Sequence, residues 1–109
     1  MAIPEDDLDR INRWCESCVP EEYWDQVKVE ADIAERHVTI VEVRPLWAGE
    51  SEYVRFPIAR LRYTKSTGLW SLYWRDRNLK FHKYDIEPTA TVGTLLDHIE
   101  NSGDPIFFG

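Results

Sequence analysis

The sequence predicts a single α+β domain over residues 1–109, with an N-terminal helix, a five-stranded antiparallel meander, a C-terminal helix and a short apolar tail. Three observations predict this class. Apolar residues recur at helical spacing near both ends of the chain. Period-two alternation fills the middle, and the segments between the strands are too short for parallel crossovers. A chain of this length buries roughly two-thirds of its unfolded surface, so it can form a core without a metal or a disulfide.

The first helix is predicted from Pro4 to Cys18. Leu8, Ile11 and Cys15 recur at spacings of three and four residues, which places them on one stripe. Carboxylates in the first turn complement the positive end of the helix dipole. Pro20 disfavours helical geometry at the residue before it, so we expect the helix to end there, followed by a short second turn.

Five strands are predicted between the two helices. The second strand changes its apolar phase between Ile40 and Val41, which indicates a bulge or burial on both faces. Pro57 lies within the third strand and predicts an edge position or a bulge. The turns are expected at 64–68, where Gly68 permits a positive φ, and at 76–78. The predicted strands are Val27–Ile33, His37–Arg44, Tyr53–Tyr63, Leu69–Arg75 and Lys80–Tyr84.

The closing helix is predicted from Thr91 to Asn101, with Leu95 and Ile99 on its apolar face and Gly103 as its C-terminal stop. The tail from Pro105 to Gly109 is apolar to its last residues. It either closes the core as an extra edge strand or docks on a partner. Packing on the core is the more common outcome, because monomers rarely expose apolar patches.

The net charge of −7 is unevenly distributed. Residues 1–36 hold eleven acidic against four basic residues, residues 37–86 hold five against nine, and residues 87–109 hold four against none. The acidic total argues against binding duplex DNA, since phosphate contacts need a local excess of Lys and Arg. A local basic face in the middle of the chain remains compatible with this distribution.

We expect a cytoplasmic protein. No apolar run approaches the ~20 residues that span a bilayer, and the acidic N-terminus lacks the features of a secretion signal. Cys15 and Cys18 would then stay reduced. Their C-x-x-C spacing is shared by zinc ligands and redox pairs, but a reactive pair sits at a helix N-terminus, and no paired histidines complete a zinc site. We therefore expect two buried or half-buried thiols, no metal and no cofactor.

One face of the last three predicted strands carries candidate binding residues. With Trp70, Leu72, Trp74 and Phe81 facing the core, strict alternation places polar and basic side chains on the opposite face. Arg contacts phosphate through two hydrogen bonds, Tyr stacks on unpaired bases, and His serves in acid–base chemistry. A solvated outer face, or pairing of these arginines with the acidic helices, is the more common explanation of such residues. The candidates are Arg60, Arg62, Tyr73, Arg75, His82 and Tyr84.

Several stretches spread over nearly the whole chain match a known pattern. They are Arg13–Glu16, Val41–Pro45, Pro57–Tyr63, Thr67–Asn78, Tyr84, Glu87–Pro88 and Ile106–Gly109, with Thr67–Asn78 the most specific. Through them the chain resembles the uncharacterised bacterial proteins grouped as domain of unknown function 3024. Cys18 is not part of that pattern, and Phe108 stands where the family more often has Trp. The resemblance implies a compact bacterial domain and no mechanism.

The leading expectation for function is a non-catalytic binding or accessory module that engages a protein or RNA partner through the Arg/Tyr face. An alternative is a metal-independent ribonuclease resembling the RelE-type toxins, by analogy of architecture alone. A third is an acidic decoy whose helices mimic nucleic acid. Whether any chemistry occurs, which partner binds and which oligomer forms are not encoded in these patterns.

Overall fold

The computed structural model describes residues 3–45 and 53–102. The predictions for Gly103 and for the apolar tail fall outside these residues. The elements in chain order are α1 (Glu5–Cys18), the 3-10 helix η1 (Glu21–Tyr23), β1 (Lys28–Ile33), β2 (His37–Pro45), β3 (Tyr53–Thr64), β4 (Leu69–Arg75), β5 (Phe81–Lys83) and α2 (Val92–Asn101).

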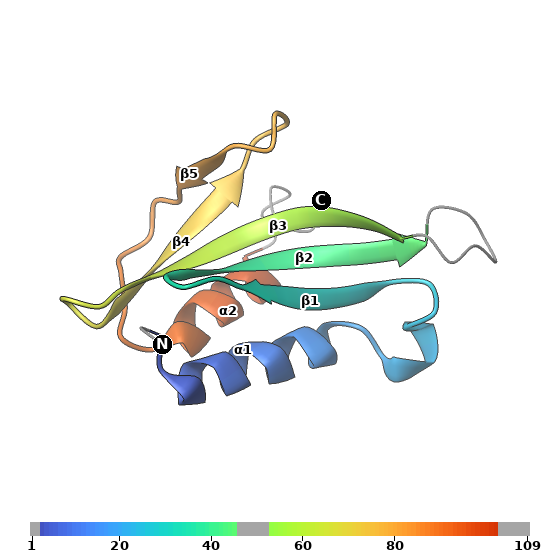
Figure 1. The fold of residues 1–109 in the computed structure, drawn as a ribbon, viewed down its shortest axis with the longest axis horizontal. Coiled ribbons are helices and arrows are strands. Elements are labelled where there is room, and N and C mark those ends of the chain that lie inside the picture. The colour runs from blue at the N-terminus through green and yellow to red at the C-terminus, as the bar shows by residue number, and fades with distance from the viewer. Residues whose placement is uncertain (1–2, 46–52, 103–109) are drawn as a thin grey trace.

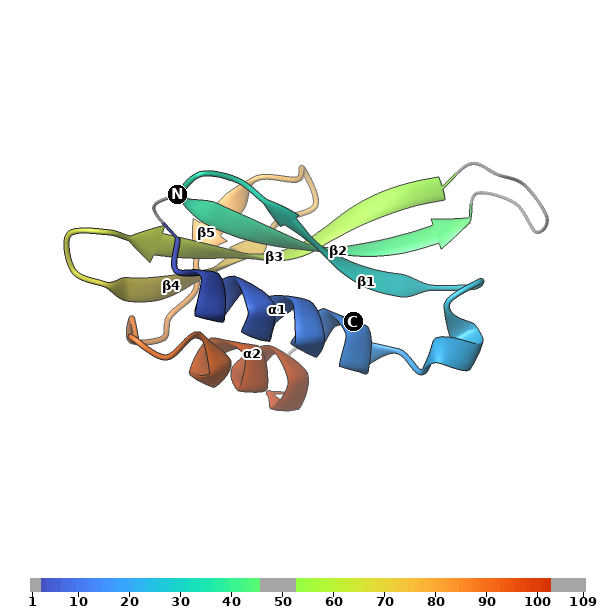
Figure 2. The ribbon, with the colours of Figure 1, turned by 60° about the horizontal axis from the view of Figure 1, so that its bottom comes forward.

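The five strands form one antiparallel sheet in the order β1-β2-β3-β4-β5, which confirms the predicted α+β meander. Figure 1 shows α1 and α2 beneath the same face of this sheet, and Figure 2 shows the two helices packed side by side. We call the opposite face the outer face. In the described part of the chain no helix covers it. None of the described helices is long and apolar enough to cross a membrane.

The core lies between the sheet and the two helices. The predicted stripe of α1 is confirmed by the burial of Leu8 and Ile11, and Leu95 and Ile99 of α2 are buried opposite them. Ile3 is buried in the same cluster, next to the start of α1. Each helix therefore presents one apolar side to the sheet and leaves its charged side exposed.

Trp70 connects three parts of this core. Its side chain is fully buried in β4, and its Nε1 donates to Asp7 Oδ2 in the first turn of α1 at 3.0 Å. Its backbone also exchanges two hydrogen bonds with Thr89, in the segment that leads into α2. Trp70, Leu72 and Trp74 all point toward the helices, as predicted, with Trp74 at the edge of the core.

The bulge predicted from the phase change in β2 is confirmed. Ile40 pairs with Ala59 but Val41 pairs with Pro57, so Ile58 is the extra residue of β3. Pro57 therefore occupies a bulge in a central strand, where its missing N–H costs no ladder bond. Val41 is also buried although it faces away from the helices, so the second alternative, burial on both faces, holds as well.

The predicted phase of the last strand is wrong. The loop between β4 and β5 has five residues, 76–80, and it pairs Arg75 with Phe81 and Trp74 with His82. Cross-strand partners share a face, so Phe81 lies on the outer face with Arg75, and His82 lies on the helix side. The His82 ring is 4.9 Å from the Trp74 ring. The strand is also shorter than the predicted Lys80–Tyr84.

Tyr84 follows the same shift. Its ring lies 5.1 Å from that of His98 in α2, and it packs against the edge of the core. Its predicted place on the outer face is therefore also wrong, because the loop 76–80 is one residue longer than the interval 76–79 between the two predicted strands, and a shift of one residue exchanges the two faces of a strand.

We predict that Trp70→Phe lowers the free energy of unfolding by about 2–4 kcal/mol, because it leaves a cavity in the core and removes the hydrogen bond to Asp7. Trp24→Phe is the matched control. Trp24 also donates its Nε1 to a backbone carbonyl, that of Val19, but it is only half-buried. Urea titration should show less than half the loss in the control. Equal losses would contradict the central role of Trp70.

Candidate functional site

A row of side chains crosses the outer face from β2 to β5. The strand register places Thr39 beside Arg60, Arg60 beside Tyr73, and Tyr73 beside Lys83. Neighbouring strands are ~4.8 Å apart, so each side chain of the row lies next to the one on the adjacent strand. The row alternates cations with polar and aromatic groups.

Arg60 is held in place at the centre of this row. Its Nε donates to Thr39 Oγ1 at 3.1 Å, and its guanidinium lies 4.0 Å from the centre of the Phe81 ring. Burial lowers the pKa of Arg60, since desolvation disfavours the charged form. The guanidinium is thus oriented and partly desolvated before any partner binds, and its terminal nitrogens remain available.

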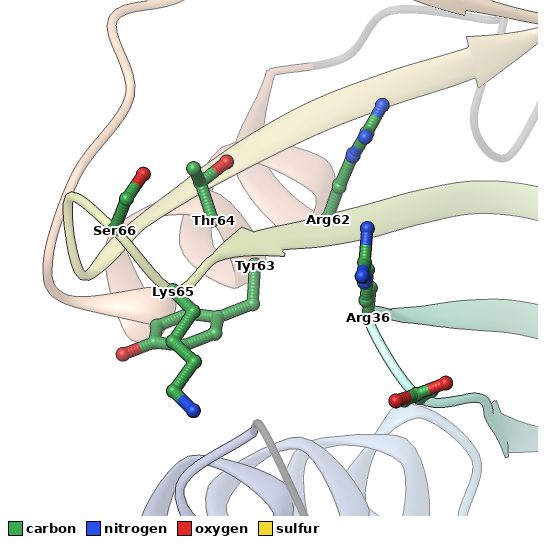
Figure 3. Close-up of a pocket in the computed structure, with 7 residues that line it drawn as sticks. Arg36, Arg62, Tyr63, Thr64, Lys65 and Ser66 are labelled. Carbon is green, nitrogen blue, oxygen red and sulfur yellow. The ribbon is translucent and has the colours of Figure 1, made fainter.

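Arg36 and Arg62 both lie beyond Arg60, toward the turn between β1 and β2. Together with His37, Arg60, Tyr73 and Phe81 they line a cavity of about 280 Å³, which we call the basic hollow. Arg36 and Arg62 also line a neighbouring cavity of about 340 Å³ at the β3–β4 turn. Figure 3 shows both arginine side chains projecting away from the helices, while Tyr63 and Lys65 point toward them. The two cavities share these arginines and form one continuous surface.

His37 shares the basic hollow with the arginines. Its pKa is lowered from 6.5, first by burial and then by the charges of Arg60 and Arg62. A lowered pKa leaves the imidazole neutral at neutral pH, so the positive charge of the hollow comes from the arginines.

The arginines of the basic hollow lack anionic partners. Across residues 3–45 and 53–102, neither Arg36, Arg60 nor Arg62 forms an ion pair, and the acidic helices lie on the other face of the sheet. The pairing of Arg60 and Arg62 with those helices, considered from the sequence, is therefore not observed. The ion pairs in the described ranges join Arg44 to Glu42, Arg55 to Glu30 and Asp32, and His82 to Asp76.

Arg75 lies on the outer face as predicted, but its side chain is already engaged. Its Nε donates to the carbonyl of Pro57 in the bulge, and its Nη1 donates to the carbonyl of Asp76 at 3.3 Å. A guanidinium that satisfies the bulge backbone has fewer donors left for a partner. We therefore place Arg75 among the residues that shape the face and leave it out of the basic hollow.

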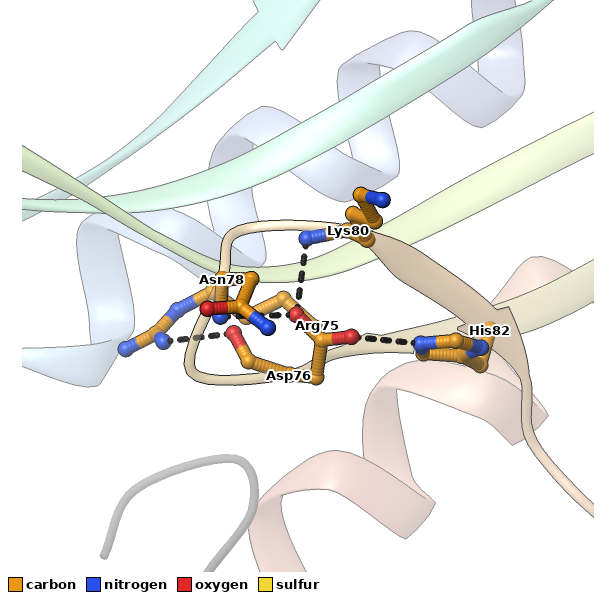
Figure 4. Close-up of polar contacts among 5 residues, drawn as sticks. All are labelled: Arg75, Asp76, Asn78, Lys80 and His82. Atoms are coloured by element: carbon orange, nitrogen blue, oxygen red, sulfur yellow. Dashed lines mark hydrogen bonds and ion pairs between the residues drawn. The ribbon is translucent and has the colours of Figure 1, made fainter.

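His82 takes part in a different cluster, shown in Figure 4. The Asp76 carboxylate accepts the backbone N–H groups of Asn78 and Lys80 at 2.8 and 3.0 Å, and it lies 2.7 Å from His82 Nε2. The hydrogen bond from His82 is the main cause that lowers the pKa of Asp76 to about 2. This cluster closes the β4–β5 loop.

The two cysteines behave as predicted. Cys15 is buried, Cys18 is half-buried, and both are free thiols. Burial raises the pKa of each to about 12, with a further contribution from the neighbouring Cys18 for Cys15 and from Glu100 for Cys18. Among the residues that the structure describes, no group of three or more His, Cys, Asp or Glu is arranged to hold a metal ion.

The sequence reasoning missed three members of the basic hollow. Arg36 lies in the turn before β2, where no periodicity points to a face, His37 is the first residue of β2, and Phe81 was predicted to face the core. A usable signal was present for His37, since the predicted β2 alternation places it on the same side as Thr39. For Phe81 the only signal is the length of the loop before it.

The family model described as "Domain of unknown function (DUF3024)" matches residues 2–109 of the chain. The match covers nearly the whole sequence and confirms the resemblance predicted from its motifs. No curated protein and no solved structure matches the chain.

We predict that His82→Ala moves the titration of the Asp76 carboxyl upward, from about 2 toward its ordinary value of 3.8, because the largest stabilising contact of the carboxylate is lost. In the wild type, Asp76 stabilises the fold above pH 4, and this stability is lost as the pH falls through about 2. NMR titration of the Asp76 side chain measures the shift. His37→Ala, on the outer face, is the control and should leave the midpoint unchanged; an unchanged midpoint in His82→Ala would contradict the assignment.

We also predict that iodoacetamide labels Cys15 and Cys18 at pH 8 at least about 100-fold more slowly in the native protein than in the urea-unfolded chain, because a pKa of about 12 leaves almost no thiolate. Mass spectrometry of quenched time points gives both rates. Rapid labelling of the native protein would revive a redox or metal role for the pair.

Proposed function

The chain belongs to the DUF3024 family, and because that family has no established activity, we propose a function from the geometry of the chain alone. The protein is a small non-catalytic accessory module of the bacterial cytosol. Its basic hollow binds an anionic partner, either a protein or an RNA.

One observation carries this proposal. A chain with a net charge of −7 gathers three arginines on the helix-free face of its sheet and gives none of them an ion-pair partner within the described ranges. Arg55, on the same face, does have carboxylate partners, Glu30 and Asp32. An anionic partner would supply the missing charges, and Arg60 would bind it without further ordering.

The geometry gives no support to the ribonuclease alternative in the form considered from the sequence. That hypothesis required His82 and Tyr84 to share an open face with Arg60 and Arg62. His82 instead lies against Trp74 and hydrogen-bonds Asp76, and Tyr84 lies against α2. The remaining histidine of the outer face, His37, has no carboxylate partner in the described part of the chain to orient it.

The acidic-decoy alternative also lacks a supporting observation. Three carboxylates of α1, Asp6, Asp7 and Asp9, line a cavity of about 510 Å³ together with Arg10 and Arg13, so the surface is mixed in charge. The Asp7 carboxylate already accepts a hydrogen bond from the Trp70 indole. A mimic of nucleic acid needs an uninterrupted row of negative charges, and this helix does not provide one.

We predict that the protein is retained on a heparin column at low salt in spite of its net charge, and that Arg60→Gln/Arg62→Gln weakens retention by about 10-fold or more in affinity, because two charge-assisted contacts are lost. The salt concentration at elution measures this. Arg10→Gln/Arg13→Gln on α1 removes the same net charge from the other side of the molecule and should elute with the wild type.

Thermal melting should leave the midpoint of Arg10→Gln/Arg13→Gln within a few degrees of the wild type, because both side chains are exposed. Arg60→Gln/Arg62→Gln should melt at a somewhat lower temperature but still cooperatively, because Arg60 is half-buried and loses its hydrogen bond to Thr39 and its contact with the Phe81 ring. A wild-type protein that passes through the column unretained would sink the proposal, as would an equal shift in the α1 control.

A further inference from the structure

We infer that the partner of the basic hollow is a single-stranded segment of RNA, with phosphates on Arg60 and Arg62 and a base stacked on Tyr73. This inference rests on the proposed function and names the partner more narrowly. Two observations support it: Tyr73 lies between Arg60 and Lys83, and its ring is partly exposed.

Tyr73 is the aromatic side chain of the hollow whose ring is not already used. Phe81 is covered by the guanidinium of Arg60. Within the described residues, Tyr73 takes part in no ring contact, cation–π contact or side-chain hydrogen bond, and it is half-buried in β4. Half-burial leaves part of its surface open. An aromatic ring beside cations on an open sheet face is a stacking platform of the kind that single strands use.

Cations lie on both sides of this ring. The register places Arg60 directly beside Tyr73 on β3 and Lys83 directly beside it on β5. Arg62 lies two residues from Arg60 on the same face, which is ~6.7 Å along the strand. That separation resembles the distance between successive phosphates of an extended strand. Phosphates on the arginines would therefore leave the intervening base over the tyrosine.

A duplex does not fit this arrangement. Its bases are stacked inside the helix, so a ring that lies within a sheet face cannot reach them. The charge of a duplex would also extend beyond the hollow to parts of the outer face that carry Glu30 and Asp32. A short single strand satisfies the arginines and offers a base to the ring at the same place.

An acidic peptide fits the arginines but not the tyrosine. The face of an aromatic ring carries the negative part of its quadrupole, so a carboxylate gains nothing by lying over it. A base, in contrast, stacks on the ring without regard to sequence. The presence of an open ring at the centre of the cations therefore favours RNA over an acidic protein segment.

The test is fluorescence anisotropy with labelled oligouridylate of about ten nucleotides, within the range of site sizes found for single-strand binders. Tyr73→Leu keeps the bulk of the side chain but removes the ring, and it should weaken binding by about 5- to 150-fold. Arg60→Gln/Arg62→Gln should make the slope of log K against log salt less steep by about 1.4, because two phosphate contacts are lost.

The matched control is Tyr53→Leu/Arg55→Gln. Both residues belong to β3; Tyr53 is exposed at its beginning, and Arg55 is already paired with Glu30 and Asp32. This variant should bind the oligouridylate as the wild type does. The label must also be recovered on intact RNA, since shortened products would overturn the non-catalytic module itself.

Three further probes separate the outcomes. Equal affinity for an RNA duplex, tighter binding of an oligothymidylate, or equally effective competition by polyglutamate would each overturn single-stranded RNA as the occupant. So would wild-type affinity in Tyr73→Leu. If heparin retention still depends on Arg60 and Arg62 in any of these cases, the proposed function survives and only the inference fails. Failure to bind both heparin and RNA removes both.

Discussion

The burial of Trp70 is the constraint on which the rest of the structure depends. Its indole is fully buried and donates a hydrogen bond to Asp7 of α1, and its backbone is hydrogen-bonded to Thr89, in the segment that leads into α2. A rotation or a register shift of β4 would therefore break contacts with both α1 and the segment before α2. Side chains alternate along a strand, so an inward Trp70 requires an outward Tyr73. The β3–β4 register then places Arg60 beside Tyr73 on the outer face. The basic hollow is thus a geometric consequence of packing on the opposite side of the sheet.

The bulge at Ile58 divides the outer face into two regions of different charge. Arg55 and Arg60 are separated by an odd number of residues and would lie on opposite faces of a regular strand. The extra residue brings both onto the outer face. At one end Arg55 is neutralised by Glu30 and Asp32, while at the other end Arg60 and its neighbours remain unpaired. Arg75 stabilises the bulge that separates the two regions, because its Nε donates a hydrogen bond to the carbonyl of Pro57.

The elements that sequence patterns predicted well are those whose burial is strongly periodic. The stripes of both helices and the alternation around Trp70 and Leu72 each repeat a hydrophobic signal, and their phases are correct. The phase of β5 was not predictable in this way, because it depends on the loop before it. That loop is set by hydrogen bonds to the Asp76 carboxylate and by the left-handed backbone of Leu79, at φ 64°. The Asp76 carboxylate and the Leu79 backbone thus set the loop length. That length places His82 and Tyr84 on the helix side of the sheet and Phe81 on the outer face, next to Arg60.

The separation of charge between the two sides of the molecule limits what kind of anion the hollow can hold. The helix α1, with five carboxylates and two arginines, lies on one side of the sheet, while the unpaired arginines of the hollow lie on the other side. At physiological salt, charges interact over only about 8 Å, so a ligand within the hollow responds to the arginines and scarcely to the acidic helix. A long polyanion that extends past the hollow meets the negative remainder of the chain. If the hollow binds an anion as proposed, the overall charge of −7 would restrict that anion to a short or locally extended one, and the arginines would determine where on the surface it binds.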